Sequence, residues 1–379
     1  MMGSLVKEDL AVSFDGIEDP RLDRSKKYPL NEIIFLAIFG ALLGIESWRG
    51  LELLGEERLL FLRKFFPYKE GIPSHQTIGR VFSILRPKSF EDFFMSYSAM
   101  LCGPNSGKQI AMDGKAVRGS YDKASGKQAL HLLHAHAVDC GITLGQLEVG
   151  AKTNEITTVP QMIDALDVTG AMISVDALNT QREIAKKIID AKADYTLALK
   201  GNHKNLNEEV KHIFDTQQPA AASHFVESDK GHGRVTERSY DVIEVDKYNL
   251  PQAPEWAGLQ AVGRVQTTVW KNDKETSETR FYLLSYCDVN LFAKTARGHW
   301  AVESLHWTLD VTFSEDASRK RKDHAPRNYS LIRKFALNMI KAVKGKLSVP
   351  LIHIKSAANP EFLTSMLVKS GFQLLEAEF

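Results

Sequence analysis

The chain has 379 residues, with 48 Lys and Arg against 47 Asp and Glu, a formal net charge of +1, and 44% hydrophobic residues. These values are typical of globular proteins, so they exclude whole-chain disorder, a collagen-like repeat and a small disulfide scaffold. The length predicts two or three domains. A net charge near zero argues against a nucleic-acid partner only if the charges are spread evenly along the chain.

Cysteine spacing and hydropathy indicate a cytoplasmic protein without a membrane segment. Cys102, Cys140 and Cys287 form no CxxC pair, so neither a disulfide framework nor a thiolate zinc site is predicted. The N-terminus lacks an apolar signal core. The longest apolar run, residues 33–45, has 13 residues, fewer than the ~20 that a membrane helix needs. We expect a buried helix there.

Residues 1–100 read as a helical N-terminal domain. Pro29 can begin a helix through the apolar run, and residues 48–66 repeat leucines near helical spacing. Ser74 is a plausible N-cap for a short helix that exposes polar side chains, namely Gln76, Thr77 and Arg80. Such a helix, entered through a tight turn, suits a helix-turn-helix that contacts DNA. The alternative is a helix that is merely solvated on one face, as most helices of this kind are.

The hydrophobic period changes after residue 107. Residues 107–204 predict three strands, then helix, strand, helix and strand, a mixed α/β order in which the later strands can lie parallel. Residues 205–285 read as a β-rich insertion of hairpins. Helices return over residues 286–346, from about Asn290 through Phe313 and from about Asn328, and residues 347–379 form a C-terminal tail region.

Two carboxylates follow strands of this predicted sheet. Asp113 lies in AMDGKA and Asp176 in ISVDAL. Sites in open α/β sheets form outside strand ends, so the two acids can converge, and two neighbouring carboxylates stay ionised most easily around a hard divalent cation such as Mg²⁺. The alternative for Asp176 is a local cap beside Asn179 and Thr180.

A polar stripe marks the helix predicted around residue 303. His299, Glu303, His306 and Asp310 share one face of a continuous helix by i, i+3 and i+4 spacing. Polar groups of this kind are rarely buried without partners, so the stripe can face a metal. The alternative is a solvated stripe with ion pairs along the helix.

At this point the chain resembles a known family. AMDGKAVRGS, ISVDALNTQ, LALKGNH, GHGRVTER and HWAVESLHWTLDVTFSEDASR follow in this order. They are similar to motifs of the DDE transposases of bacterial insertion sequences, in particular the H-repeat-associated group, and the resemblance covers nearly the whole chain. It implies an α/β fold with a ribonuclease H-like mixed-sheet catalytic core, interrupted by the β-rich insertion.

The resemblance also implies the chemistry and the partners. Asp113, Asp176 and Glu303 would be the catalytic and metal-binding triad, with two Mg²⁺ or Mn²⁺ ions once DNA is bound. The partners would be double-stranded DNA, both the ends of the chain's own mobile element and target DNA, and a second copy in a homodimer on paired ends. A bacterial cytoplasmic, nucleoid-associated location follows.

One departure from the family concerns cations near the glutamate. Many relatives have Tyr seven residues before the glutamate, Arg four residues before it and Lys seven residues after it. This chain has Ala296, His299 and Asp310 at these positions. We therefore regard His299, His306 and Asp310 as possible auxiliary residues. The expected DNA contacts lie near the acids, in the insertion and after the Glu303 helix: Lys115, Arg118, Lys200, Asn202, Arg234, Arg297, Arg319, Lys320, Arg321 and Lys322.

The even net charge hides one basic segment. Residues 317–346 contain ten Lys or Arg and one acid, Asp323, a net of +9. We expect the phosphate backbone of DNA to follow this segment.

Two other functions remain open. A zinc hydrolase could use His299, Glu303 and His306, although the HExxH spacing is missing. A catalytically inactive DNA-binding relic of a transposase would keep the fold without turnover.

Overall fold

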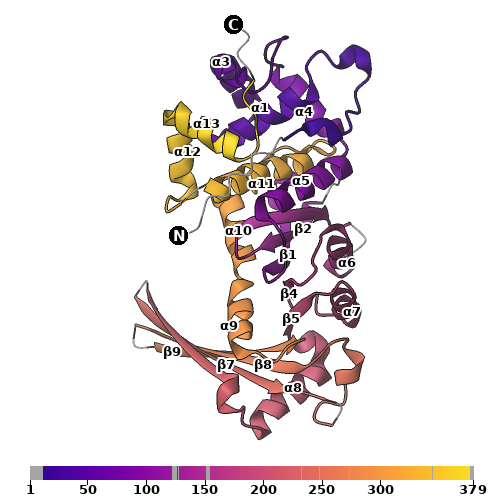
Figure 1. Cartoon of the computed structure of the whole chain (residues 1–379), viewed down its shortest axis with the longest axis vertical. Helices are drawn as coiled ribbons and strands as arrows, with labels where there is room; N and C mark the ends of the chain where they lie inside the picture. Colours follow the sequence, from indigo (N-terminus) through magenta and orange to yellow (C-terminus); the bar gives the residue numbers. More distant parts are fainter. Residues whose placement is uncertain are drawn as a thin grey trace.

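The structure is a computed structural model that describes residues 12–121, 126, 128–150, 154–231, 233–246, 248–272, 274–343 and 345–375. It is elongated, with helices at one end, a sheet in the middle and long β-hairpins at the other end (Figure 1). No helix among these residues is long and apolar enough to cross a membrane.

The N-terminal hundred residues are helical, as predicted. The helices are α1 (Leu30–Leu42), α2 (Trp48–Glu57), α3 (Leu59–Leu62), α4 (His75–Ile84) and α5 (Pro87–Cys102). The apolar run forms α1, which is buried along almost its whole length. Since α1 packs inside the protein, its uniform hydrophobicity reflects a core position.

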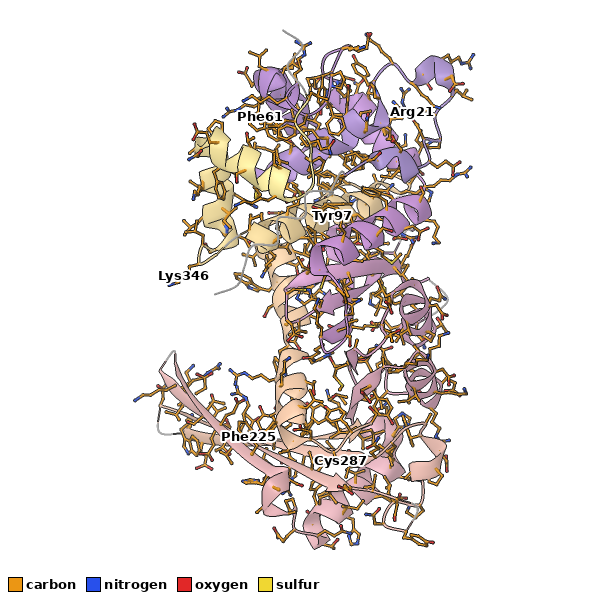
Figure 2. All side chains as sticks on the ribbon, viewed as in Figure 1. Arg21, Phe61, Tyr97, Phe225, Cys287 and Lys346 are labelled. Carbon is orange, nitrogen blue, oxygen red and sulfur yellow. The ribbon has the colours of Figure 1, made fainter. Side chains whose placement is uncertain are left out.

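The two ends of the chain share one hydrophobic core. Three late helices, α11 (Ala325–Val343), α12 (Val349–Ala358) and α13 (Pro360–Lys369), pack with α1 and α5. Aromatic rings contribute much of this core: Phe335 contacts Phe90, Phe94 and Tyr97. In Figure 2 the side chains around Phe61 and Tyr97 fill this end of the molecule. The segment predicted as a tail therefore completes the helical part.

A single mixed sheet forms the middle. Its first five strands are β1 (Gln109–Val117), β2 (Leu130–Ala137), β3 (Ile142–Glu148), β4 (Met172–Val175) and β5 (Asp194–Leu199). They lie in the order β3-β2-β1-β4-β5, with β1, β2 and β3 antiparallel and β1, β4 and β5 parallel. The predicted mixed order and the parallel later strands are confirmed.

The β-rich stretch extends the same sheet. After α8 (Lys204–Thr216) come β6 (His224–Gly231), β7 (Arg234–Glu244), β8 (Ala261–Lys271) and β9 (Lys274–Leu284). Strand β9 pairs antiparallel with β5, which makes a sheet of nine strands over the described residues. The hairpins are thus continuous with the parallel strands through backbone hydrogen bonds.

Helices cover both faces of the first five strands. On one side lie α6 (Glu155–Ala165) and α7 (Arg182–Asp190), and on the other lie α9 (Val289–Gly298) and α10 (Ala301–Val311), end to end (Figure 1). A continuous helix was predicted over α9 and α10, and this prediction is wrong. The junction is tightened by i→i−3 bonds, from Trp300 N–H to Arg297 C=O and from Val302 N–H to His299 C=O.

A buried ion network ties the sheet to the helical end. Glu315, fully buried after α10, lies 3.1 Å from Lys115 Nζ on β1 and 3.7 Å from Lys334 Nζ on α11. Arg333 extends the network to Glu46, before α2, at 2.6 Å. Burial alone would raise the pKa of Glu315, but the cations of Lys334, Lys115 and Arg333 outweigh it and lower the pKa to about 2.

We expect Glu315→Gln to reduce the free energy of unfolding by about 3–5 kcal/mol, because it leaves buried cations without their shared counter-ion. Urea denaturation measures this. The matched control is Glu70→Gln, which removes an exposed carboxylate 3.9 Å from Lys27 and should change stability by less than about 0.5 kcal/mol. Equal effects of the two variants would contradict a structural role for the network.

Candidate active site at the edge of the parallel strands

Strand register places Asp113 and Asp176 next to each other. The parallel ladder pairs Met112 with Val175, so the two aspartates are the next residues on neighbouring strands. Residues 109–112 and 172–175 are buried, and the chain becomes half-buried at each aspartate. Asp176 directly follows β4, as predicted, whereas Asp113, predicted at a strand end, lies in the middle of β1 where that strand passes the end of β4.

Glu303 approaches the same edge from α10. That helix buries Val302, Leu305 and Leu309 against its neighbours and leaves Glu303 exposed on the opposite side. Helix α10 contacts β1 and β2. The predicted three acids are therefore brought together by two parallel strands and one helix.

Burial and the neighbouring carboxylates change the pKa of Asp113. Burial, followed by the carboxylates of Asp176, Glu155 and Glu303, raises the pKa of Asp113 from 3.8 to about 7. Among the described residues, no three carboxylate, imidazole or thiol side chains already surround a single ion position. Oxygen donors that repel one another nevertheless fit a hard divalent cation such as Mg²⁺ or Mn²⁺, because the cation would relieve the repulsion.

The histidines and the aspartate of the predicted stripe have different hydrogen-bond and ion-pair partners, although His299 and Glu303 line one cavity. His306 lies with Nε2 2.9 Å from His134 Nδ1 and Nδ1 3.7 Å from Asp113, whereas His299 Nδ1 lies 3.0 Å from Ser174 Oγ. Burial lowers the pKa of His299 to about 4, and burial with the nearby Lys115 and Lys334 lowers that of His306 to about 3, so both imidazoles are neutral at pH 7.

The fourth member of the stripe, Asp310, faces a cation. Its carboxylate lies 2.6 Å from Lys115 Nζ. The stripe therefore does not face a metal as a whole, because Asp310 pairs with Lys115, whereas His306 lies close to Asp113. A Cβ at Gly298 would lie 2.0 Å from Gln109 Oε1, which shows how closely the junction packs on β1.

Sequence reasoning missed the acid Glu155. Its carboxylate, at the start of α6, lies 3.0 Å from His131 Nε2 and accepts a 2.8 Å hydrogen bond from Asn179 Nδ2. The Asn179 side chain also donates to Asp176 Oδ1 at 2.9 Å, and its backbone N–H donates there at 3.1 Å. The alternative that Asp176 caps the next helix is wrong, because α7 begins at Arg182 with Gln181 as its N-cap, and the Asp176 carboxylate accepts these hydrogen bonds within the preceding turn.

A glycine next to Asp113 makes room for this pair. A Cβ at Gly114 would lie 2.0 Å from Glu155 Oε1 and 2.6 Å from His131 Nε2. The Asp-Gly pair in AMDGKA was the available sequence signal, since a glycine inside a strand often marks a close approach.

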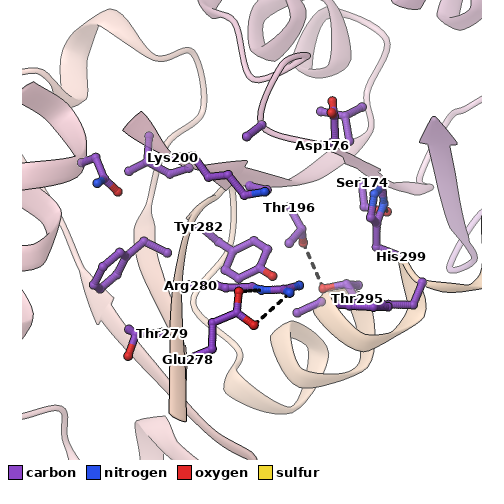
Figure 3. Close-up of a pocket in the computed structure, with 18 of the residues that line it drawn as sticks. Ser174, Asp176, Thr196, Lys200, Glu278, Thr279, Arg280, Tyr282, Thr295 and His299 are labelled. Carbon is purple, nitrogen blue, oxygen red and sulfur yellow. Dashed lines mark hydrogen bonds and ion pairs between the residues drawn. The ribbon is translucent and has the colours of Figure 1, made fainter. Parts of the chain in front are cut away.

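A cavity of about 330 Å³ opens beside Asp176 and Glu303. Lys200 and Arg280 extend toward it from β5 and β9 (Figure 3). The Arg280 guanidinium pairs with Glu278 at 2.8 Å and lies 4.8 Å from the centre of the half-exposed Trp300 ring. The cavity therefore combines cations with an aromatic surface next to the acids, and Arg280 was not predicted.

Two predicted DNA contacts are directed inward, and for them the prediction is wrong. Lys115 is buried and surrounded by Asp310, Glu315 and Asp316. Lys320 is largely buried, with Nζ 3.8 Å from the centre of the Tyr329 ring, and burial lowers its pKa to about 7.

The other predicted contacts lie at the surface, several with protein partners. Arg297 pairs with Glu227 and Asp229, Asn202 donates to the Ala177 carbonyl, and Arg118 lies 3.5 Å from Asp316. Lys200 lines the cavity, and Arg234 is exposed at the start of β7. The exposed residues after α10 are Arg319 and Lys322, with Arg321 half-buried over Tyr121.

The basic segment is partly interior. Arg333 and Lys334 are buried in the ion network, and Arg327 pairs with Glu91 and Glu148. These cations are not available to phosphates, which corrects the expectation for the whole of residues 317–346. Lys344 lies outside the described residues.

The first four cations of the segment, residues 319–322, line a groove of about 710 Å³ together with α4. Its lining includes His75, Gln76, Thr77 and Arg80 of α4 and residues 319–322, and none of its lining residues among those described is acidic. Residues 63–74 separate α3 from α4, so the tight turn of a helix-turn-helix is absent and that prediction is wrong. Helix α4 is fixed instead by Asn328, whose side chain donates to the Phe82 and Leu85 carbonyls.

Sequence comparison identifies the family of this fold and acid cluster. Residues 104–339 match the transposase DDE domain, and residues 11–98 match the domain described as DDE_Tnp_1-associated. The chain therefore belongs to the DDE transposase family.

Its relatives include H-repeat-associated proteins. It is 36% identical over 339 residues to "Putative transposase YncI" of Escherichia coli O157:H7, covering 86% of each chain. It is 32% identical over 366 residues to "H repeat-associated putative transposase YhhI" of E. coli K12, covering 94% of this chain and 96% of the relative. A solved piggyBac transposase synaptic complex aligns with a TM-score of 0.39 and 12% identity over 95% of this chain and 80% of that one, too distant to support an inference.

We expect the Asp113→Asn substitution to stabilise the protein in a chelator above pH 7, by about 2–4 kcal/mol. The folded state binds the Asp113 proton more tightly than the unfolded state does, so wild-type stability falls as pH rises from about 4 to about 7. Below pH 4 the two proteins should be equally stable.

Denaturation at a series of pH values measures this difference. Asp23→Asn, at a fully exposed carboxyl beside Lys26, is the control and should change stability by less than about 0.5 kcal/mol at every pH. Parallel pH profiles for wild type and Asp113→Asn would show that the Asp113 carboxyl is not crowded.

Proposed function

We propose that this protein is an active DNA transposase that cleaves phosphodiester bonds at the ends of its mobile element and joins them to target DNA, using divalent metal ions. The observation that supports this most is the convergence of Asp113, Asp176 and Glu303, with the pKa of Asp113 raised by burial and by its carboxylate neighbours. Such a cluster lowers the stability of the folded protein when no cation is bound, and it supplies ligands when a metal ion binds.

We infer that the core is ribonuclease H-like. The strand order β3-β2-β1-β4-β5, with β2 antiparallel to β1 and β4 and β5 parallel to it, agrees with the fold that the family resemblance implies. Strands β6–β9 then form the insertion between the last core strand and the helix of the third acid.

The three acids would hold one or two Mg²⁺ or Mn²⁺ ions. When bound, these ions would supply an activated water or 3′-hydroxyl and neutralise charge on the phosphate during in-line displacement. The chain's own residues orient the site: Asn179 fixes the Asp176 carboxylate, and the neutral His306 lies against Asp113. Lys200 and Arg280 place positive charge in the adjacent cavity, where the DNA backbone passes.

The competing functions have less support. A zinc hydrolase would need His299 and His306 to converge with Glu303, but the two imidazoles face Ser174 and His134. An inactive relic would keep the fold and lose turnover. One relative, matched over 56 residues, is named "Inactive transposase YbfQ", which makes a direct assay necessary.

We propose that duplex DNA runs from the acid cluster to the groove between α4 and residues 319–322. Arg80, Arg319 and Lys322 would contact phosphates there, and Gln76 and Thr77 lie at the start of α4, where side chains can reach base edges. Arg118, Lys200 and Arg234 would contribute further backbone contacts. Assembly as a homodimer on paired ends and a location on the bacterial nucleoid follow from this function.

We expect Asp113→Asn, Asp176→Asn and Glu303→Gln each to lower cleavage and joining of the element's own ends by at least about 100-fold, because metal ions contribute several kcal/mol of transition-state stabilisation. Incubation with Mg²⁺ or Mn²⁺ and labelled end DNA, followed by gel analysis, measures both steps.

Glu361→Gln, on α13 at the helical end, is the matched control and should keep full activity. If the wild type neither nicks nor joins those ends, the active-transposase proposal fails. If only Glu303→Gln is fully active, the third acid has been misassigned.

We expect the double substitution Arg319→Ala and Lys322→Ala to weaken binding of duplex DNA and to reduce the slope of log K against log salt by about two, one for each lost phosphate contact. Fluorescence anisotropy over a range of salt concentrations measures the slope. Lys369→Ala together with Lys355→Ala, on α13 and α12, removes the same charge elsewhere and should leave the slope unchanged. An unchanged slope for the groove variant would exclude these contacts.

A further inference from the structure

Two of the three cysteines meet in space, although they are separated in sequence. Cys102 is the last residue of α5, and Cys140 lies in the turn between β2 and β3. Their Sγ atoms are 2.7 Å apart, and both side chains are half-buried, so they remain accessible to a small molecule. The sequence predicted no disulfide framework, because the spacing of the cysteines cannot show that the end of α5 lies beside the β2–β3 turn.

A lysine distinguishes the two thiols. Lys108 Nζ lies 3.5 Å from Cys102 Sγ and is held there by a 2.6 Å hydrogen bond to the Cys102 carbonyl. The Cys140 Sγ contacts the Ala137 carbonyl at 3.7 Å. The hydrogen bond from Cys140 and the charge of Lys108 lower the pKa of Cys102, whereas the pKa of Cys140 is raised. Cys102 is thus the thiol that ionises first.

We propose that Cys102 and Cys140 are a thiol-oxidation site that forms an intramolecular disulfide with a low-molecular-weight disulfide as oxidant. The Cys102 thiolate attacks one sulfur of the oxidant, forms a mixed disulfide and releases one thiolate. Cys140 then loses its proton and attacks the Cys102 sulfur, which releases the second thiol. The two protein thiols lose two electrons in total, and the oxidant is reduced to two thiols.

The bond would close a loop that contains β1 and β2. These strands carry Asp113 and His134 of the acid cluster. Asp139, beside Cys140, accepts a 2.8 Å hydrogen bond from the Gln109 N–H at the start of β1 and pairs with Lys294 of α9 at 2.6 Å. Oxidation therefore fixes the end of α5 to the strands beneath the acids, without touching a residue of the proposed catalytic set.

The third cysteine is a control within the same chain. Cys287 lies just before α9 (Figure 2), with its Sγ 3.9 Å from Gln260 Oε1, and burial raises its pKa. It has comparable exposure to the paired cysteines. Any reagent that oxidises thiols merely because they are accessible should reach Cys287 as readily.

The test treats the reduced, folded full chain with glutathione disulfide, quenches with acid, alkylates free thiols and maps the peptides by mass spectrometry. We expect a Cys102–Cys140 linked peptide to appear at least about tenfold faster than glutathione adds to Cys287, because reactivity follows the thiolate fraction and access. In denaturant this advantage should disappear.

Variants test the order of attack. Cys140→Ser should accumulate glutathione on Cys102, Cys102→Ser should leave Cys140 as slow as Cys287, and Lys108→Met should slow the first step. The linked peptide should form normally in Cys287→Ser. The proposal is overturned if no linked peptide forms in the folded protein, if it forms as fast in denaturant, or if Cys140 takes up glutathione in Cys102→Ser as fast as Cys102 does in Cys140→Ser.

Discussion

Unbalanced negative charge at the edge of β1 and β4 is the constraint on which the rest of this structure depends. Four carboxylates, those of Asp113, Asp176, Glu155 and Glu303, act on one another there. The nearest buried lysine, Lys115, is two residues from Asp113 on the same strand face, but Asp310, Glu315 and Asp316 surround its ammonium. The protein therefore neutralises the structural acids Asp310, Glu315 and Asp316 with its own cations, whereas the carboxylates around Asp113 raise its pKa.

Helix α11 holds the buried ion pairs in place. It packs in the aromatic core shared by both ends of the chain, and its residues Arg333 and Lys334 pair with Glu46 and Glu315, respectively. The same helix holds α4 through Asn328. One buried helix thus contacts both the buried Glu315 that follows α10 and the helix that forms one wall of the basic groove.

The elements with a strong period were predictable from sequence, and so was the position of Asp176 directly after β4. Asp113 was expected at the end of its strand but lies in the middle of β1, where β1 passes the end of β4. The buried state of Arg333 and Lys334 was not predictable, since a charge count treats every cation as exposed and Glu46, the partner of Arg333, lies far away in the sequence. The prediction of a metal-facing stripe around Glu303 was limited for a related reason. Helical spacing gives the positions of side chains along α9 and α10 but not their partners, such as Lys115 for Asp310 and Ser174 for His299.

The pairing of β9 with β5 attaches the hairpins rigidly to the parallel strands. The sheet is continuous through backbone hydrogen bonds from β6 to β3. Strand β5, which comes directly before Lys200, joins the long hairpins to the other parallel strands. Arg280 lies on β9 directly before Phe281, which pairs with Leu199 of β5, so the hairpin strand itself forms part of the cavity wall. Because the connection is a shared sheet and not a loop, backbone hydrogen bonds set the direction of the hairpins relative to the parallel strands.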